Sequence, residues 1–263
     1  MKGRSIMNTP AAPQQLSAAL MNIRILLPES KDPDCENKID SIHKALSFAA
    51  PAIIEHHGRL TGVNEAGIEA VFENGDNVLE GAFAVIRNAS QVQKDDTSSL
   101  SVGIHFGPVF ITKVSYGDFS TTLAISGGMR EAHRLSRCAS RYGAAILITE
   151  TAAKNIRAFR TRFAARRLGA VLNAENGNRE IVYDVFDSDP TEIKYRKRRS
   201  RLVFENGVEM FLEGNYSKAR SYFIELLKYD RNDIAAKKYV FLCDKALSEK
   251  QVDNEVKYLE IWN

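Results

Sequence analysis

The chain has 263 residues, of which 44% are apolar and 26% carry a charge, and its net charge is only +3. This composition is typical of a globular protein, and so small a net charge excludes a chain that binds nucleic acid or membranes through overall charge alone. Because its apolar runs stay far short of the roughly 18–20 residues that cross a bilayer, we predict no membrane span.

The three cysteines, Cys35, Cys138 and Cys243, are far apart and odd in number. This usage favours reduced thiols in the cytoplasm over a disulfide framework. Residues 1–20 contain no apolar segment of the kind that directs secretion, and we interpret them as a flexible leader.

Hydrophobic periodicity then predicts the elements in chain order. We expect a strand over 22–27, a helix over 36–56, a hairpin of 59–63 and 67–73, and a helix over 77–91. A second hairpin, 100–106 and 109–115, is predicted to turn at Gly107-Pro108. A helix over 128–141, a strand over 145–149, a short helix over 151–159 and strands over 163–170 and 179–186 follow. Strands and helices in this mixed order predict an α+β domain whose sheet is flanked by helices.

The pattern changes after residue 187. Residues 188–200 are polar and basic, which indicates a linker, and residues 201–263 are predicted to form a small all-α appendage. Gly207, Ala219 and Phe223 are spaced as in one tetratricopeptide-type helical hairpin. Asn232-Asp233 is expected to cap a third helix. Since a single hairpin of this type cannot cover its own apolar face, it must pack on the main domain, on a partner or on repeats outside this chain.

Three segments together resemble a known family. They are GIHFGPV at 103–109, SGGMREAHRL at 126–135 and YGAAILITE at 142–150. In this order they are similar to the class III adenylate/guanylate cyclase catalytic domain. The resemblance implies that residues 21–187 form a cyclase-like sheet flanked by helices, and that the chain pairs with a second cyclase-like domain as a homodimer or heterodimer.

The family holds two metal ions with two aspartates, and the resemblance places neither in this chain. Leu26, or its neighbour Leu27, occupies the first position. Ala66 occupies the second, because Gly67, Ala70 and Phe72 set the register of that hairpin. Glu65 is a weak substitute, since one residue of slip along a strand points a side chain to the other face. We therefore expect no cofactor, and Mg²⁺ or Mn²⁺ only if the chain is active.

The resemblance also assigns the nucleotide-binding and catalytic positions. Leu123 falls where the family selects its base, and Gly127-Gly128 opens the helix that follows. Arg130 replaces the family asparagine, and Arg134 retains the arginine that stabilises the transition state. Arg130 and Arg134 lie one turn apart, so they predict either an anion site or a solvated or interface-facing basic stripe continued by Arg137 and Arg141.

Two further basic runs lie at 157–167 and 194–201. Neither is interleaved with stacking aromatics or belongs to a known reader motif, so nucleic-acid binding is not expected. The C-terminal helices are instead expected to provide a surface for a protein partner.

Three functions remain open from the sequence. The first is a non-catalytic cyclase homology module in intracellular signalling that acts through dimerisation or partner binding. The second is a divergent cyclase that makes a cyclic nucleotide from ATP or GTP, alone or as half of a heterodimer. The third is a nucleotide or anion sensor that uses the former active-site cleft.

Overall fold

The computed structural model describes residues 12–26, 35–64, 67–92, 99–116, 118–173 and 177–248. The strands are β1 (Gln14–Leu26), β2 (Arg59–Asn64), β3 (Gly67–Phe72), β4 (Ser99–Tyr116), β5 (Phe119–Ile125), β6 (Ile146–Thr149), β7 (Ala165–Leu172) and β8 (Arg179–Val185). The α-helices are α1 (Cys35–Glu55), α2 (Gly75–Val92), α3 (Gly128–Ala139), α4 (Glu150–Lys154), α5 (Phe159–Arg162), α6 (Thr191–Leu212), α7 (Tyr216–Tyr229) and α8 (Ile234–Ser248), and the 3₁₀ turn η1 (Ser140–Tyr142) follows α3.

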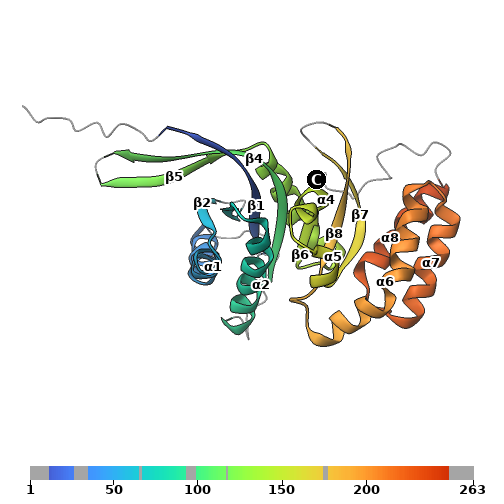
Figure 1. Ribbon diagram of the computed structural model, residues 1–263. Helices are drawn as coiled ribbons and strands as arrows, with labels where there is room; N and C mark the ends of the chain where they lie inside the picture. The colour runs from blue at the N-terminus through green and yellow to red at the C-terminus, as the bar shows by residue number, and fades with distance from the viewer. Residues whose placement is uncertain are drawn as a thin grey trace, which may run out of the picture.

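These strands form one eight-stranded mixed sheet in the order β2-β3-β1-β4-β6-β8-β7, with β5 paired to β4 beside this path (Figure 1). The β4–β6 pair is parallel, and the other strand pairs are antiparallel. This is the α+β fold that the mixed order of elements predicts, a sheet flanked by helices. Among the described helices, none is both long and apolar enough to cross a bilayer.

Alternate residues of β1 enter two different cores. Met21 and Ile23 pack with α1 and α2, whereas Leu20 packs with Met129 and Ala132 of α3. Successive side chains of a strand point to opposite faces, so α1 and α2 cover one face of the sheet and α3 covers the other. Gly103 permits the close approach of α3, because a Cβ at this position would lie 2.0 Å from the carbonyl oxygen of Ala132.

The predicted turn at Gly107-Pro108 is wrong. Residues 99–116 form the single strand β4, and Pro108 is paired with Ser17 of β1. On the other edge of β4, Pro108 falls between the stretch paired with β6 (Val102–Ile104) and the stretch paired with β5 (Phe110–Tyr116). A proline, which has no N–H to donate, is tolerated in a strand where one side of the ladder is interrupted.

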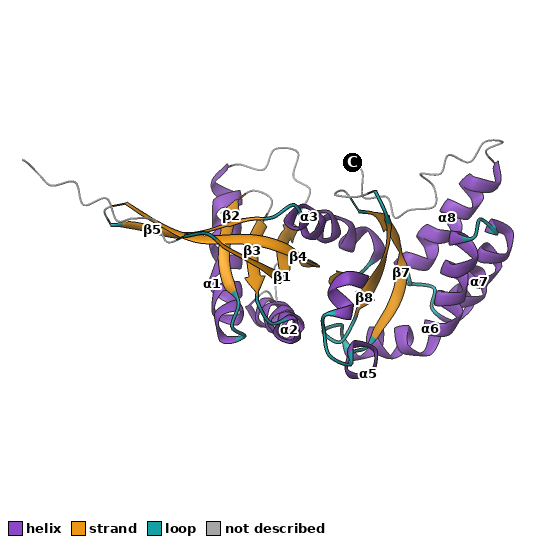
Figure 2. Ribbon diagram, turned by 45° about the horizontal axis from the view of Figure 1, so that its top comes forward, coloured by secondary structure: helices purple, strands orange, loops and turns teal. Residues whose placement is uncertain are grey.

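The end of β4 and strand β5 form a hairpin that the sequence analysis did not predict. This hairpin and the beginning of β1 extend beyond the helices as a three-stranded arm (Figures 1 and 2). The predicted leader over 1–20 is therefore too long, since β1 begins at Gln14 and Ala18, Ala19 and Leu20 are buried. The start of this strand lacks the apolar pattern by which a strand is predicted. Its residues Gln14, Gln15 and Ser17 are polar because they are exposed to solvent on the arm.

The predicted linker over 188–200 is also wrong. Most of it belongs to α6, which runs without a break from Thr191 to Leu212. Its basic residues are not all solvated: Lys197 is buried, and its Nζ lies 3.0 Å from Oδ2 of Asp184 and 2.7 Å from Oδ2 of Asp189. A lysine that is neutralised in this way can face the interior of the protein, which a count of charges along the sequence does not show.

The helices α6, α7 and α8 are the predicted C-terminal all-α part, and they pack on the main domain, which is one of the predicted alternatives. Their apolar side chains share one core with α3 and with strands β6, β7 and β8, including Leu135, Leu147 and Val182. At the α6–α7 contact, a Cβ at Gly207 would lie 2.9 Å from the ring of Phe223, so the predicted contact of these two residues is confirmed. The predicted cap of α8 is confirmed as well, since Oδ1 of Asp233 accepts from the backbone N–H of Ala236 at 2.9 Å. That the hairpin is of the tetratricopeptide type stays a prediction.

Candidate functional site

The N-terminus of α3 is held tightly against the sheet. The Ser126 hydroxyl accepts a hydrogen bond from the Gly128 N–H at 3.1 Å and donates to the Pro108 carbonyl at 2.6 Å. Gly128 is buried, and a Cβ there would lie 2.8 Å from the His105 ring and equally close to Leu20. Gly127 is exposed and precedes the first residue of the helix. Of the two predicted nucleotide-binding glycines, only Gly127 therefore faces solvent.

Arg134 points into the protein. Its Nη1 donates to both carboxylate oxygens of Glu131, at 2.9 and 3.0 Å, and to the backbone carbonyl of Leu172 at 3.0 Å. Both side chains are buried, and Leu172 lies at the end of β7. A guanidinium that forms charge-assisted bonds of this kind is held in one orientation. Arg134 thus ties α3 to β7.

Arg130 lies one turn before Arg134 but is exposed. The structure does not bring the two guanidinium groups to one site, because Arg134 is directed at Glu131 and Leu172. Neither alternative from the sequence describes Arg134, since it is neither solvated nor paired with Arg130. Leu123, at the predicted base-selector position, lies on β5 in the arm and is 43% exposed.

A second polar group lies beneath the N-terminus of α3. Oε1 of Glu180 on β8 accepts from the N–H of Thr151, and Oε2 accepts from Nδ2 of Asn173, both at 3.1 Å. Nδ1 of His105 lies 3.0 Å from the Thr149 hydroxyl and 4.0 Å from Glu180. Burial raises the pKa of the Glu180 carboxyl, but the hydrogen bonds and His105 outweigh burial and hold that pKa below its usual range.

Replacement of Glu180 by glutamine is expected to lower the free energy of unfolding near neutral pH by about 1–3 kcal/mol, because an amide NH₂ would then face a hydrogen-bond donor. A depressed carboxyl pKa contributes stability above the unfolded value of about 4.3, and that contribution is lost as the pH falls through the folded value. Urea unfolding from neutral to acidic pH should therefore show the wild type and Glu180→Gln converging in acid. The exposed Glu209→Gln is the control, and a Glu180 difference that is constant with pH would contradict this account.

A third polar group, which was not predicted from the sequence, lies between β1, β3 and α3. Asn22 of β1 is fully buried and is paired across the sheet with Glu69 of β3. The Ser136 hydroxyl donates to Oδ1 of Asn22 at 2.5 Å, and Nε2 of His133 lies 2.9 Å from Oε1 of Glu69. The close contact with His133 is the main cause that lowers the pKa of the Glu69 carboxyl. The signal in the sequence was the single asparagine within the apolar run over 18–23.

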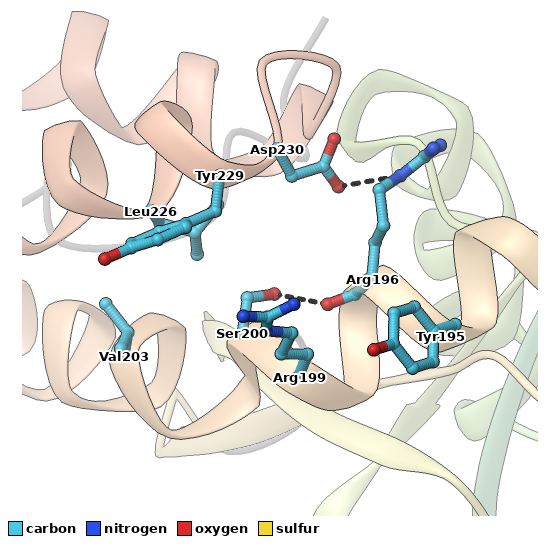
Figure 3. Close-up of a pocket in the computed structure, with 8 residues that line it drawn as sticks. All are labelled: Tyr195, Arg196, Arg199, Ser200, Val203, Leu226, Tyr229 and Asp230. Carbon is cyan, nitrogen blue, oxygen red and sulfur yellow. Dashed lines mark hydrogen bonds and ion pairs between the residues drawn. The ribbon is translucent and has the colours of Figure 1, made fainter.

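A hollow of about 400 Å³ lies elsewhere, between α6 and α7 (Figure 3). Its rim carries two exposed tyrosines, Tyr195 and Tyr229, and Leu226 and Val203 line it between the helices. An ion pair of 3.3 Å between Arg196 and Asp230 joins the two helices at this hollow. Its lining comes entirely from α6, α7 and the residue that follows α7, so it is separate from the groups around α3.

Comparison with known proteins shows that this architecture is similar to that of nucleotide cyclases. The computed structure is similar to a bacterial light-regulated adenylyl cyclase (TM-score 0.56, 17% identity, covering 72% of this chain and 58% of that one). It is also similar to the adenylyl cyclase CyaB from P. aeruginosa (TM-score 0.52, 12% identity, covering 67% and 97%). A guanylyl cyclase domain from Blastocladiella emersonii, described as a non-canonical dimer, superposes with a TM-score of 0.50 at 11% identity, covering 66% of this chain and 98% of that one.

The fold is that of a class III nucleotide cyclase catalytic domain. In sequence, the cyclase-like chain is 24% identical over 218 residues to the terminal-differentiation specific adenylate cyclase of Dictyostelium discoideum. That match covers 79% of this chain but spans only 10% of the length of the Dictyostelium protein. No family model matches the chain.

Within the cyclase-like domain, only one of the two predicted metal positions, Leu26, lies among the described residues. Leu26 ends β1 and is paired with Ser99 of β4, three residues beyond Ile23, the last β1 residue paired with β3. Ala66 and Glu65 lie outside the described residues. Over the part of the chain that is described, no three histidine, cysteine or carboxylate side chains come together as metal ligands would.

Proposed function

We propose that the chain is a non-catalytic cyclase homology module that acts in signalling through association with a second copy or another cyclase-like domain. One observation carries the proposal. Arg134, the residue at the transition-state position, is buried and bonded to Glu131 and to the Leu172 carbonyl. Transition-state stabilisation needs a donor aimed at the place where charge develops, and this guanidinium is aimed into its own domain.

The residues at the other positions that the resemblance assigns support the same conclusion. Leucine at 123 has no hydrogen-bonding group for a base edge, and arginine at 130 replaces a short amide with a long, exposed cation. Leucine at 26 and alanine at 66 offer no oxygen ligand, whereas Mg²⁺ is bound through oxygens. A module with these four residues retains the frame of the fold without the groups that the chemistry of the family requires.

The arm supports association. Phe110 of β4 is paired with Ile125 of β5, and Thr112 is paired with Leu123, so these four residues lie on one face. Phe110, Leu123 and Ile125 are respectively 48%, 43% and 61% exposed. We name these three residues the arm patch. Contiguous exposed apolar residues mark interaction surfaces. The Blastocladiella domain is described as a non-canonical dimer, and we propose, from the exposure of the arm patch, that these three residues lie at an interface with a second cyclase-like domain.

The purified chain is expected to form no cyclic nucleotide from ATP or GTP with Mg²⁺ or Mn²⁺ above the level of a blank. Without carboxylate ligands at positions 26 and 66, the metal ions that would clamp the triphosphate have no site. Chromatographic measurement of cyclic AMP and cyclic GMP over several protein concentrations checks this expectation. Steady product formation that Glu65→Ala abolishes would overturn the proposal in favour of the divergent cyclase.

A further inference from the structure

The two basic runs of the sequence, which are separated by more than 20 residues, meet in the fold. The first supplies α5 and the start of β7, and the second supplies the first half of α6. Figures 1 and 2 both show α5 beside α6, and the carboxylate of Glu205 on α6 bridges to this region. It accepts from Nη2 of Arg160 at 3.1 Å and from the backbone N–H of Arg167 at 2.8 Å.

A hollow of about 320 Å³ lies where the two runs meet. Four arginines line it: Arg160 and Arg162 from α5, and Arg198 and Arg201 from α6. The remaining lining residues are Thr161, Phe163 and Ala164, so the lining contains no carboxylate. Arginine is the side chain best suited to bind phosphate, because its donors form a planar fork.

Two of these arginines are held in place by partners outside the hollow. Arg160 binds Glu205, and Nη1 of Arg162 lies 3.1 Å from Asp76. Arg162 also lies over the ring of Phe163, with 4.8 Å between the guanidinium carbon and the ring centroid. These contacts orient the two guanidinium groups before any ligand binds, and such preorganisation lowers the entropic cost of binding.

The positive charges of the other two arginines are only weakly compensated by nearby carboxylates. Arg198 is 62% exposed in its side chain, and its nearest carboxylate, Asp187, is 3.8 Å away. Within the described part of the chain, no carboxylate lies within ion-pair distance of Arg201. Arg198 and Arg201 are three residues apart on α6, a spacing at which like charges repel. An anion in the hollow would remove this repulsion.

We infer that this hollow is a binding site for a small, multiply charged oxyanion of the phosphate class, such as a diphosphate or the phosphates of a nucleotide. We name it the arginine pocket. Its volume is at the lower end of the range for small-ligand sites, and its lining is mainly polar, which favours a compact anion over an apolar ligand. Since the pocket is built from α5 with the two residues that follow it and from α6, a bound anion would bridge α5 and α6.

Calorimetric titration of the full chain with inorganic diphosphate tests the site. The wild type is expected to bind diphosphate. The affinity of Arg198→Gln/Arg201→Gln is expected to be lower by at least about ten-fold, since each contact to a charged group contributes substantially to affinity. Both arginines lie on α6, and glutamine is a good helix former, so the double variant should retain its fold and melting temperature. Binding should also weaken as the salt concentration rises.

The control is Arg199→Gln/Arg231→Gln, which removes the same charge from exposed positions outside the pocket. If the control variant lost as much affinity for diphosphate, the effect would be due to overall charge and the proposed site would be refuted. Loss of binding in Arg130→Gln would place the anion at α3 instead, and absence of binding to the wild type would also refute the inference. A clear preference for single-stranded oligonucleotide over diphosphate, at equal phosphate concentration, would replace it with nucleic-acid binding. Because none of these titrations measures turnover or dimerisation, the result is independent of the proposed function.

Discussion

Replacement of Arg166 by alanine is expected to lower the free energy of unfolding by about 3–5 kcal/mol, because it leaves the buried carboxylate of Asp233 without its ion-pair partner and leaves Asp184 with Lys197 alone. Arg166 on β7 is 1% exposed. Its Nε lies 3.0 Å from Oδ2 of Asp184 on β8, and its Nη1 binds Asp233, the capping residue of α8. The guanidinium carbon lies 4.1 Å from the centroid of the Phe204 ring on α6. One side chain thus joins the sheet to two of the C-terminal helices.

Urea denaturation monitored by circular dichroism measures this effect, and Arg220→Ala is the matched control. Arg220 forms an ion pair with Asp244, but both side chains are exposed at 42% and 51%, and exposed pairs of this kind contribute only about 0–1 kcal/mol. A single cooperative transition is expected in both variants, because the helices and the sheet share one core. A loss similar in the two variants, or separate melting of α6–α8 in the wild type, would contradict this account.

Leu123→Glu/Ile125→Glu is expected to weaken self-association by at least about 100-fold, because two charges would enter an apolar interface whose central residues commonly contribute 2 kcal/mol or more each. This expectation rests on the proposed function, since it requires the arm patch to lie at the interface. Sedimentation velocity across a range of concentrations measures the change.

Ser120→Glu/Thr122→Glu is the control for the arm. These residues lie on the same strand, and their side chains point to the opposite face, because successive positions alternate. The control variant should associate like the wild type. A monomeric wild type at high micromolar concentration would remove the arm patch as an interface, and equal dissociation of both variants would show that any charge on the arm disrupts it.

Local patterns in the sequence determined much of the fold. Periodic apolar residues predicted α1, α2 and α3 and the strands β2, β3, β6, β7 and β8 close to their observed bounds. The cap of α8 was predicted from Asp233, and the contact of Gly207 with Phe223 from their spacing. Such features depend on residues a few positions apart, or on one helical hairpin, so the sequence alone contains their cause.

Other features depend on neighbours distant in the chain. Whether β4 turns or continues at Gly107-Pro108 was decided by its ladder with β1, whose residues are more than 70 positions away in the sequence and pair with the strand on both sides of the proline. Whether residues 188–200 are a linker or a helix was decided by Asp184 and Asp189, which neutralise the buried Lys197. In each case the residue types were interpreted correctly, as a Gly-Pro pair and as a basic segment. The secondary structure predicted from them was wrong.

The site shows the same division. The sequence predicted Arg134 as the retained arginine of a cyclase frame, and this assignment stays a prediction, but only the tertiary structure decided what its side chain binds. The partner on the neighbouring turn, Glu131, is visible in the sequence, whereas the carbonyl of Leu172 is brought to it by the packing of α3 against β7. A buried arginine side chain orients toward the hydrogen-bond acceptors around it, because burying its charge without them is costly. The residue type therefore follows from the sequence, and its role from the three-dimensional set of acceptors that the fold assembles.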